Sequence, residues 1–126
     1  MKVLLDTHTF LWAISDSAKL SPVARRAIAS SERFCSVASV WEVLIKVQIG
    51  RLPLPTPAGE HLTARMTANG VGILPIKLEH VLRVESLEMH HRDPFDRLLI
   101  AQSIEEGWPI ITADPWFSRY PVEILW

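Results

Sequence analysis

Four acidic residues in this sequence occupy positions from which carboxylates can do chemistry. Asp6 and Asp114 each follow directly on a short apolar segment, KVLL and PIITA. Glu42 lies inside the apolar segment VASVWEVLIKV, and Asp96 stands three residues after Asp93 at the start of another apolar run. Carboxylates that converge repel one another, so a cluster of them favours a bound cation. Hard oxygen ligands, with no cysteine or histidine at metal-binding spacing, indicate Mg²⁺ or Mn²⁺ rather than Zn²⁺.

Each of these acids also has a purely structural explanation, which for Asp96 is the start of its helix. Asp6 and Asp114 can cap the helix or turn that follows a strand. Glu42 can form an ion pair with Lys46, one helical turn further on. Small residues one turn before Glu42 nevertheless leave space for an ion or a substrate, so both interpretations stay open.

The segment HRDPFDRLLIAQS contains the fourth acid. Asp93 followed by Pro94 is typical of a helix N-cap, which places Asp96 in the first turn, where the helix dipole favours a negative charge. On the helix surface Asp96 lies in line with Leu99 and Ser103, toward packed residues rather than water. Asp93 is therefore predicted to cap, and Asp96 is the aspartate that can serve a site.

Three basic residues surround this helix start. His90 and His91 are expected in a solvated loop, because adjacent residues rarely point toward one ion. Arg97 has two possible roles: a contact with a substrate phosphate, or an ion pair with Asp93 one turn earlier.

The elements that must position these residues follow from the apolar pattern. Strands are predicted over residues 2–5 and 34–37 and at GILPI, PIITA and VEILW. This alternation with helices predicts an α/β fold, a three-layer α/β/α sandwich around a mostly parallel five-stranded sheet. Such sheets bind ligands beyond the carboxyl ends of their strands, near the point where the strand order reverses. Helices are predicted over residues 9–15, 22–30, 39–50, 60–69, 78–87 and 94–106, with the third one buried.

Composition limits the class of protein. The 126 residues, 48% hydrophobic and 21% charged with a net charge of −1, predict one soluble globular domain over residues 1–126. Asp6 and His8 interrupt the apolar opening too early for a signal peptide or a membrane span. The single cysteine, Cys35, cannot form an internal disulfide and indicates a reducing compartment, the cytoplasm. Trp41 is expected in the core, and the other four tryptophans can lie in the core or on a partner surface, with the core favoured for most.

The charge balance bears on nucleic acids. A near-neutral chain is unlike proteins that bind polyanions indiscriminately. Nine arginines against four lysines still suit local, bidentate recognition of phosphate.

Taken together, these motifs resemble those of PIN-domain ribonucleases, and more narrowly the VapC-type toxins of toxin–antitoxin modules. The resemblance spans essentially the whole chain, including the connection GRLPLP. It is carried, in order, by LLDTHTFLW, SVWEVLIK, HRDPFDRLLIAQS and IITADPWF.

The resemblance implies a PIN-like sandwich and a metal-dependent endoribonuclease that acts as a toxin. It implies RNA as substrate, a cognate antitoxin whose tail occupies the active-site groove, and a homodimer. It also implies that Thr112 lies beside the pocket and orients a carboxylate or a water. We expect the metal on Asp6, Asp96 and Asp114, and Glu42 completing the shell or orienting the attacking water. The catalytic acids implied are Asp6, Glu42, Asp96 and Asp114.

Two other classes remain as alternatives. A phosphotransferase with Asp6 as nucleophile is disfavoured, because His8 stands where the haloacid-dehalogenase pattern has a second aspartate, and PIITA lacks the lysine of receiver domains. A catalytically silent PIN-like module that binds RNA or a protein partner is disfavoured because all four acids are present.

Overall fold

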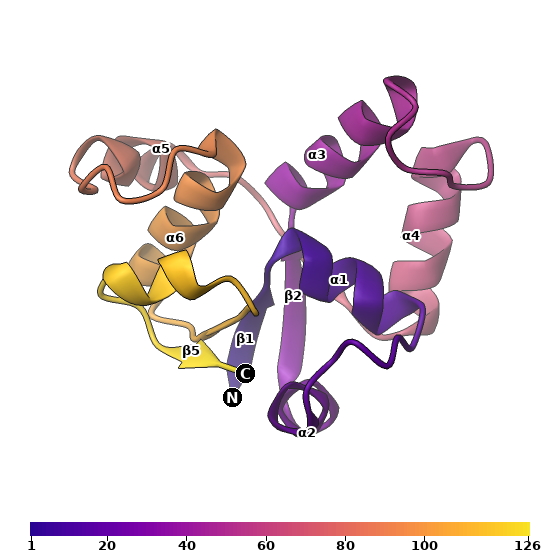
Figure 1. Cartoon of the computed structure of the whole chain (residues 1–126), viewed down its shortest axis with the longest axis horizontal. Helices are drawn as coiled ribbons and strands as arrows, with labels where there is room; N and C mark the ends of the chain where they lie inside the picture. The colour runs from indigo at the N-terminus through magenta and orange to yellow at the C-terminus, as the bar shows by residue number, and fades with distance from the viewer.

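Five parallel strands form a sheet at the centre of the molecule, and the computed structural model describes all of residues 1–126 (Figure 1). The strand order is β3-β2-β1-β4-β5, and every neighbouring pair is parallel. The chain builds outward from β1 to β3 and then continues on the other side of β1, so the order reverses between β1 and β4. The strands are β1 Lys2–Leu5, β2 Glu32–Ser36, β3 Gly72–Leu74, β4 Ile110–Ile111 and β5 Ile124–Leu125.

Helices connect the strands where the sequence predicted them, with shifts of a few residues at several ends. Two N-terminal signals are confirmed: Ser21 accepts the Ala24 N–H at 3.0 Å, and Asp93 accepts the N–H groups of Phe95 and Asp96. A short 3₁₀ helix, η1, was not predicted. The elements are α1 Thr7–Ile14, α2 Pro22–Ser30, α3 Val37–Gln48, α4 Ala58–Ala68, α5 Leu78–Glu85, α6 Pro94–Glu106 and η1 Pro115–Arg119.

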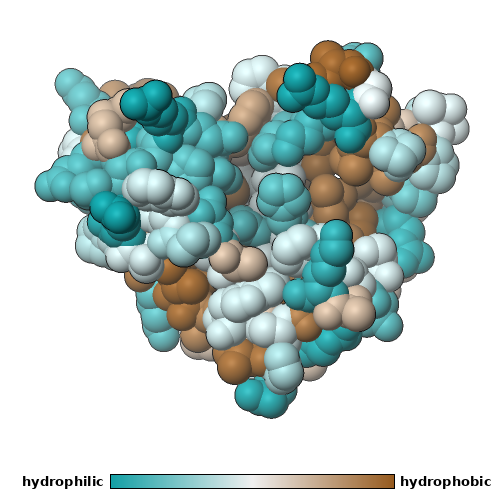
Figure 2. Space-filling model, in the orientation of Figure 1, coloured by the Kyte–Doolittle hydropathy of each residue, from teal (hydrophilic) through white to brown (hydrophobic).

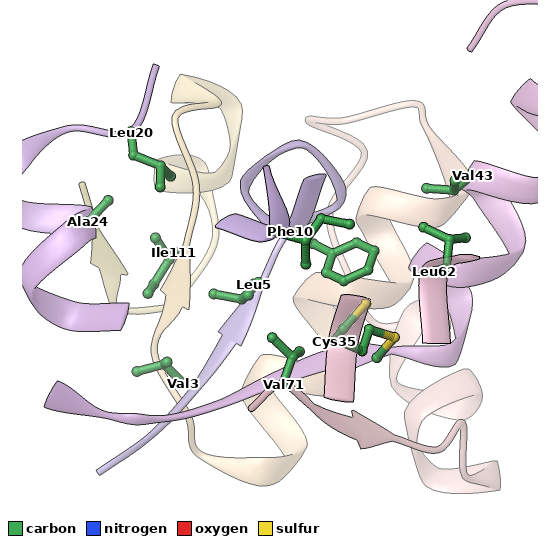
Figure 3. Packing of buried hydrophobic residues seen from close by; sticks show 12 residues of the cluster. Val3, Leu5, Phe10, Leu20, Ala24, Cys35, Val43, Leu62, Val71 and Ile111 are labelled. Atoms are coloured by element: carbon green, nitrogen blue, oxygen red, sulfur yellow. The ribbon is translucent and has the colours of Figure 1, made fainter. Parts of the chain in front are cut away.

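The central strand β1 sends side chains to two separate hydrophobic clusters. Val3 and Leu5 join the larger cluster, shown in Figure 3, whereas Leu4 joins the smaller one. This is the two-residue alternation of a strand that is covered on both faces. Burying so much apolar surface is the main stabilising contribution to the fold.

The two clusters show which helices cover which face. The larger cluster contains residues from α1 to α4, and the smaller one contains residues from α6 and η1. In Figure 1, α5 and α6 accordingly lie on the opposite side of the molecule from α1 and α4. The predicted α/β/α sandwich is confirmed. No helix combines the length and the apolar character that crossing a bilayer requires.

The prediction that the third helix is buried all round is wrong. Its buried face is lined by Glu42 and Val43, but Trp41 is 58% exposed. The Trp41 indole packs only edge-on against Phe95, with ring centroids 5.3 Å apart. A helix on the outside of a sheet presents one face to the core, so a sequence that is apolar all round leaves apolar side chains in solvent. Trp116, for which both the core and a partner surface were possible, is 47% exposed.

Candidate active site

Asp6 directly follows β1 and caps α1. One carboxylate oxygen accepts the N–H of Thr9 at 2.8 Å, and the other accepts the hydroxyl of Thr112 at 2.6 Å. The residue is only 5% exposed. The capping interpretation is therefore correct, and the carboxylate is also fixed in orientation by two donors from different elements.

Glu42 is held beside Asp6 by similar contacts. Its Oε1 accepts the hydroxyl of Thr7 at 2.7 Å, and its Oε2 lies 2.9 Å from Nζ of Lys46. The predicted pair one turn apart is thus present. Because Thr7 directly follows Asp6, its hydroxyl links the α3 carboxylate to the end of β1.

Asp114 follows β4, on the strand next to β1. Thr112 joins this acid to Asp6, because its Oγ1 donates to Asp6 and accepts the N–H of Asp114 at 3.0 Å. The Asp114 side chain also caps η1 by accepting the N–H of Trp116 at 2.9 Å. Thr112 lies beside the acids, as the family resemblance implied.

His91 joins the last two acids. Its Nε2 lies 3.0 Å from Oδ2 of Asp114 and 3.0 Å from Oδ2 of Asp96. Its Nδ1 accepts the backbone N–H of Asp93 at 3.2 Å, so the proton of the neutral ring is on Nε2, facing both carboxylates. The expectation of a solvated loop is wrong for His91, whose side chain is 15% exposed. His90 points elsewhere and pairs with Glu88 at 2.8 Å.

Arg97 explains why the histidine loop folds back onto the acids. Its guanidinium is buried and donates to carbonyls at and after the end of α5, where helical partners are lacking. Tyr120 adds to this support, because its hydroxyl accepts the N–H groups of His90 and His91. Both sequence-based roles for Arg97 are wrong: it neither pairs with Asp93 nor reaches solvent to meet a phosphate. Its acceptors are the carbonyls of Val84, Leu87, Glu88 and His91 and the hydroxyl of Tyr120.

The four predicted acids therefore meet at one edge of the sheet. Asp96 titrates under the influence of its neighbours: burial raises the pKa of its carboxyl to about 7, with further upward contributions from Asp93, Glu42 and Asp6 and a downward one from His91. A carboxyl that binds a proton this readily marks a site short of positive charge. The cluster suits a hard divalent cation, which can replace that proton.

Sequence reasoning missed His91 as a member of this site. The ligand atoms of His91, Asp96 and Asp114 lie within 4.8 Å of one another, a spacing compatible with a shared ion. With its proton on Nε2, however, the ring is a hydrogen-bond donor and lacks the lone pair of a metal ligand. In this structure His91 therefore acts as a hydrogen-bond donor that holds Asp96 and Asp114 together.

Comparison with known proteins agrees with the fold. Residues 3–123 match the family model of the PIN domain, and the chain belongs to this family. Ribonuclease VapC22 from Mycobacterium tuberculosis (strain ATCC 25618 / H37Rv) is 30% identical over 120 residues, which cover 89% of this chain and 86% of that protein.

Solved structures support the same fold. DNA-bound VapBC from Salmonella typhimurium superposes with a TM-score of 0.70 at 15% identity, covering 98% of this chain and 96% of that chain. VapC20 of Mycobacterium tuberculosis, described as a Sarcin-Ricin loop cleaving toxin, gives a TM-score of 0.60 at 19% identity, with 93% of each chain covered.

Proposed function

We propose that residues 1–126 act as one PIN domain that cleaves RNA phosphodiester bonds with Mg²⁺ or Mn²⁺, as the toxin of a toxin–antitoxin pair. The observation that carries this proposal is the meeting of Asp6, Glu42, Asp96 and Asp114 beside the strand-order reversal. The relationship to Ribonuclease VapC22 supports RNA as the substrate class.

The proposal gives each residue of the cluster a separate role. Asp6, Asp96 and Asp114 would hold the cation, and Thr112 fixes the orientation of the Asp6 carboxylate. Glu42, with both oxygens already oriented, accepts a hydrogen bond from the attacking water and aligns it. A bound divalent ion supplies an activated water and offsets the charge of the phosphate.

The substitution Asp6→Asn tests this assignment, since it keeps the size of the side chain and removes its charge. We expect cleavage of RNA in Mn²⁺ to fall by roughly 100-fold or more, because loss of a ligand exceeds the usual effect of its supporting residues. Asp16→Asn is the matched control: Asp16 is an exposed aspartate with φ 50°, a conformation that asparagine also accepts. Full activity of the Asp6 variant, or equal loss in both variants, contradicts the proposal.

An apolar hollow on the surface supports the proposal that this chain binds a protein partner. Figure 2 shows hydrophobic surface gathered between α3, α4 and α1. The hollow there has a volume of about 390 Å³, and Leu11, Trp12, Leu52 and Leu54 are among its lining residues. Apolar surface of this kind is typical of protein interfaces. We propose that a cognate antitoxin covers it in the cytoplasm, and that the product of a neighbouring small reading frame copurifies with this chain and inhibits it.

A homodimer is also part of the proposal, and sedimentation of the purified chain tests it. The competing function is a silent module that binds RNA or a protein without cleaving. Incubation with RNA in Mn²⁺ and in chelator separates the two, because only the nuclease produces metal-dependent fragments.

A further inference from the structure

A second hollow opens directly beside the acidic cluster. Its volume is about 500 Å³, and its wall comes from the loop between α5 and α6 and from η1. His91 lines this hollow and also contacts Asp96 and Asp114, so the hollow lies next to these two carboxylates. In Figure 1 the loop and the yellow turn before β5 lie on the side of the molecule that carries α6. The lining residues are Met89, His90, His91, Arg92, Trp116 and Arg119.

The charge of this hollow is opposite to that of the cluster. Arg92 and Arg119 line it, and no carboxylate does. Both arginines are exposed, and neither guanidinium has a hydrogen bond or an ion pair within the protein. Arg83 and Arg25, by contrast, are paired with Glu105 and Asp16. Two guanidiniums without hydrogen bonds or ion pairs, beside an acidic site, provide bidentate donors for the phosphate of an anionic ligand.

An indole ring completes the hollow. The Trp116 side chain is 47% exposed, and the guanidinium carbon of Arg119 lies 4.5 Å from its ring centroid. The backbone of Trp116 is fixed by the hydrogen bond from its N–H to Asp114. A large aromatic surface is therefore held in solvent two residues from a proposed metal ligand. Aromatic rings combined with arginines are the elements on which unpaired bases stack.

The chemistry of these groups selects the ligand. Bases inside a double helix are stacked on one another and cannot lie against an indole, whereas unpaired bases can. A second exposed indole, Trp41, has Phe95 against it and no cation over its ring, so it lacks the phosphate-binding partners. We propose that the hollow is a subsite for one unpaired nucleotide of RNA, with its base on Trp116 and its phosphate between Arg92 and Arg119. This proposal rests on the proposed ribonuclease function for its substrate class.

Binding without cleavage tests the subsite separately from the nuclease. The parent protein is the full chain carrying Asp6→Asn, in chelator, and the probes are a labelled single-stranded rU12 and the same strand paired with rA12. We expect the single strand to bind more tightly than the duplex. Trp116→Leu should weaken single-strand binding roughly 10-fold, and Trp116→Phe should restore most of it, because phenylalanine still offers a stacking face.

The dependence of RNA affinity on salt concentration tests the role of the arginines. Arg119→Gln should weaken binding and lower the slope of log affinity against log salt by about 1, as expected for one lost phosphate contact. Arg26→Gln is the matched control, because Arg26 is an exposed arginine on α2 and does not line the hollow. Thermal melting shows whether each variant remains folded.

The outcomes separate the two proposals. Unchanged rU12 affinity in Trp116→Leu and Arg119→Gln overturns the subsite, whether or not the wild type cleaves RNA. A change of oligomeric state in these variants without loss of RNA binding also overturns it, because the hollow is then a contact between protein chains. If the variants lose rU12 binding while the wild-type protein does not cleave RNA, the subsite is supported and the proposed nuclease function is contradicted.

Discussion

The acids of the cluster are held in two different ways. Asp6 and Glu42 are each fixed by two donors, including a threonine hydroxyl, and both are almost fully buried. Asp96 and Asp114 instead share the single Nε2 proton of His91, and their side chains are 21% and 30% exposed. Asp114 accepts one further hydrogen bond, from the N–H of Trp116. One half of the site is oriented by neutral hydroxyls from the sheet edge, and the other half depends on a loop.

This difference shows where an arriving cation has its effect. The oxygens of Asp6 are oriented before any ion binds, because Thr9 and Thr112 hold them. The pKa of Asp96 is raised to about 7, so this carboxyl must lose a proton before it can act as a ligand. A divalent ion bound there would take the place of that proton, whereas the carboxylate of Asp6 already has its orientation.

The largest effect is expected from Asp96→Asn. Removing this charge should lower RNA cleavage by roughly 100-fold or more, as for Asp6. The same change should raise the stability of the ion-free protein at pH 8 by on the order of 1–2 kcal/mol, because it removes repulsion and the burial of a charge. Chemical denaturation in chelator measures this. A loss of stability would show that Asp96 is already neutralised by His91.

A smaller effect is expected from Thr112→Val, which acts on the preorganised half. The valine keeps the shape and removes both the donor to Asp6 and the acceptor for the Asp114 N–H. Mn²⁺ affinity, measured by calorimetry, should fall roughly 10- to 100-fold, the range for residues that orient metal ligands. Thr67→Val is the matched control, because it removes an exposed hydroxyl that is bonded only to the Thr63 carbonyl. This variant should keep the Mn²⁺ affinity of the wild type. Equal affinities for both variants contradict a positioning role.

The pH dependence of ion binding follows from Asp96. Its pKa is about 7 in the folded protein against an ordinary value of 3.8, so ions compete with a proton below pH 7. Affinity should rise with pH by at most about tenfold per unit and level off above 7. The ion-free protein should lose stability as pH rises from about 4 to 7, since unfolding releases this proton. Calorimetry at several pH values measures both the ion affinity and the stability of the ion-free protein. Asp96→Asn should flatten the dependence of each on pH. An unchanged slope in that variant would mean that another group binds the proton.

The smallest effect is expected from Lys46→Met. The Lys46 ammonium is 35% exposed, and Glu42 keeps its bond to Thr7 when the lysine is lost. Screening by solvent makes such a pair weak, so kcat should fall by less than about threefold. A much larger loss would mean that the lysine itself contacts the substrate.

The sequence predicts the parts of this molecule that depend on local signals. The N-caps at Ser21 and Asp93 and the stop at Gly107 locate two helices, and apolar segments locate the strands. The ends of β1 and β4 place Asp6 and Asp114 at one edge, because parallel strands end together.

The contacts that could not be predicted from the sequence depend on how the loop between α5 and α6 folds. His91 reaches Asp96 and Asp114 only because Arg97 and Tyr120 bind the backbone of residues 84–91, and neither partner is adjacent to His91 in sequence. A buried arginine that binds carbonyls has the same sequence signal as one that pairs with an acid. The exposure of Trp116 is equally a property of the assembled surface, not of the residues beside it.

The central claim is that carboxylates that follow β1 and β4, together with one in the first turn of α6, bind one divalent ion or a close pair. Anomalous scattering from crystals grown in Mn²⁺ tests it most directly. The account predicts a manganese peak at roughly 2.0–2.4 Å from carboxylate oxygens of Asp6, Asp96 and Asp114, and its loss in Asp6→Asn. Manganese bound away from Asp6, or none at millimolar concentration, contradicts the account.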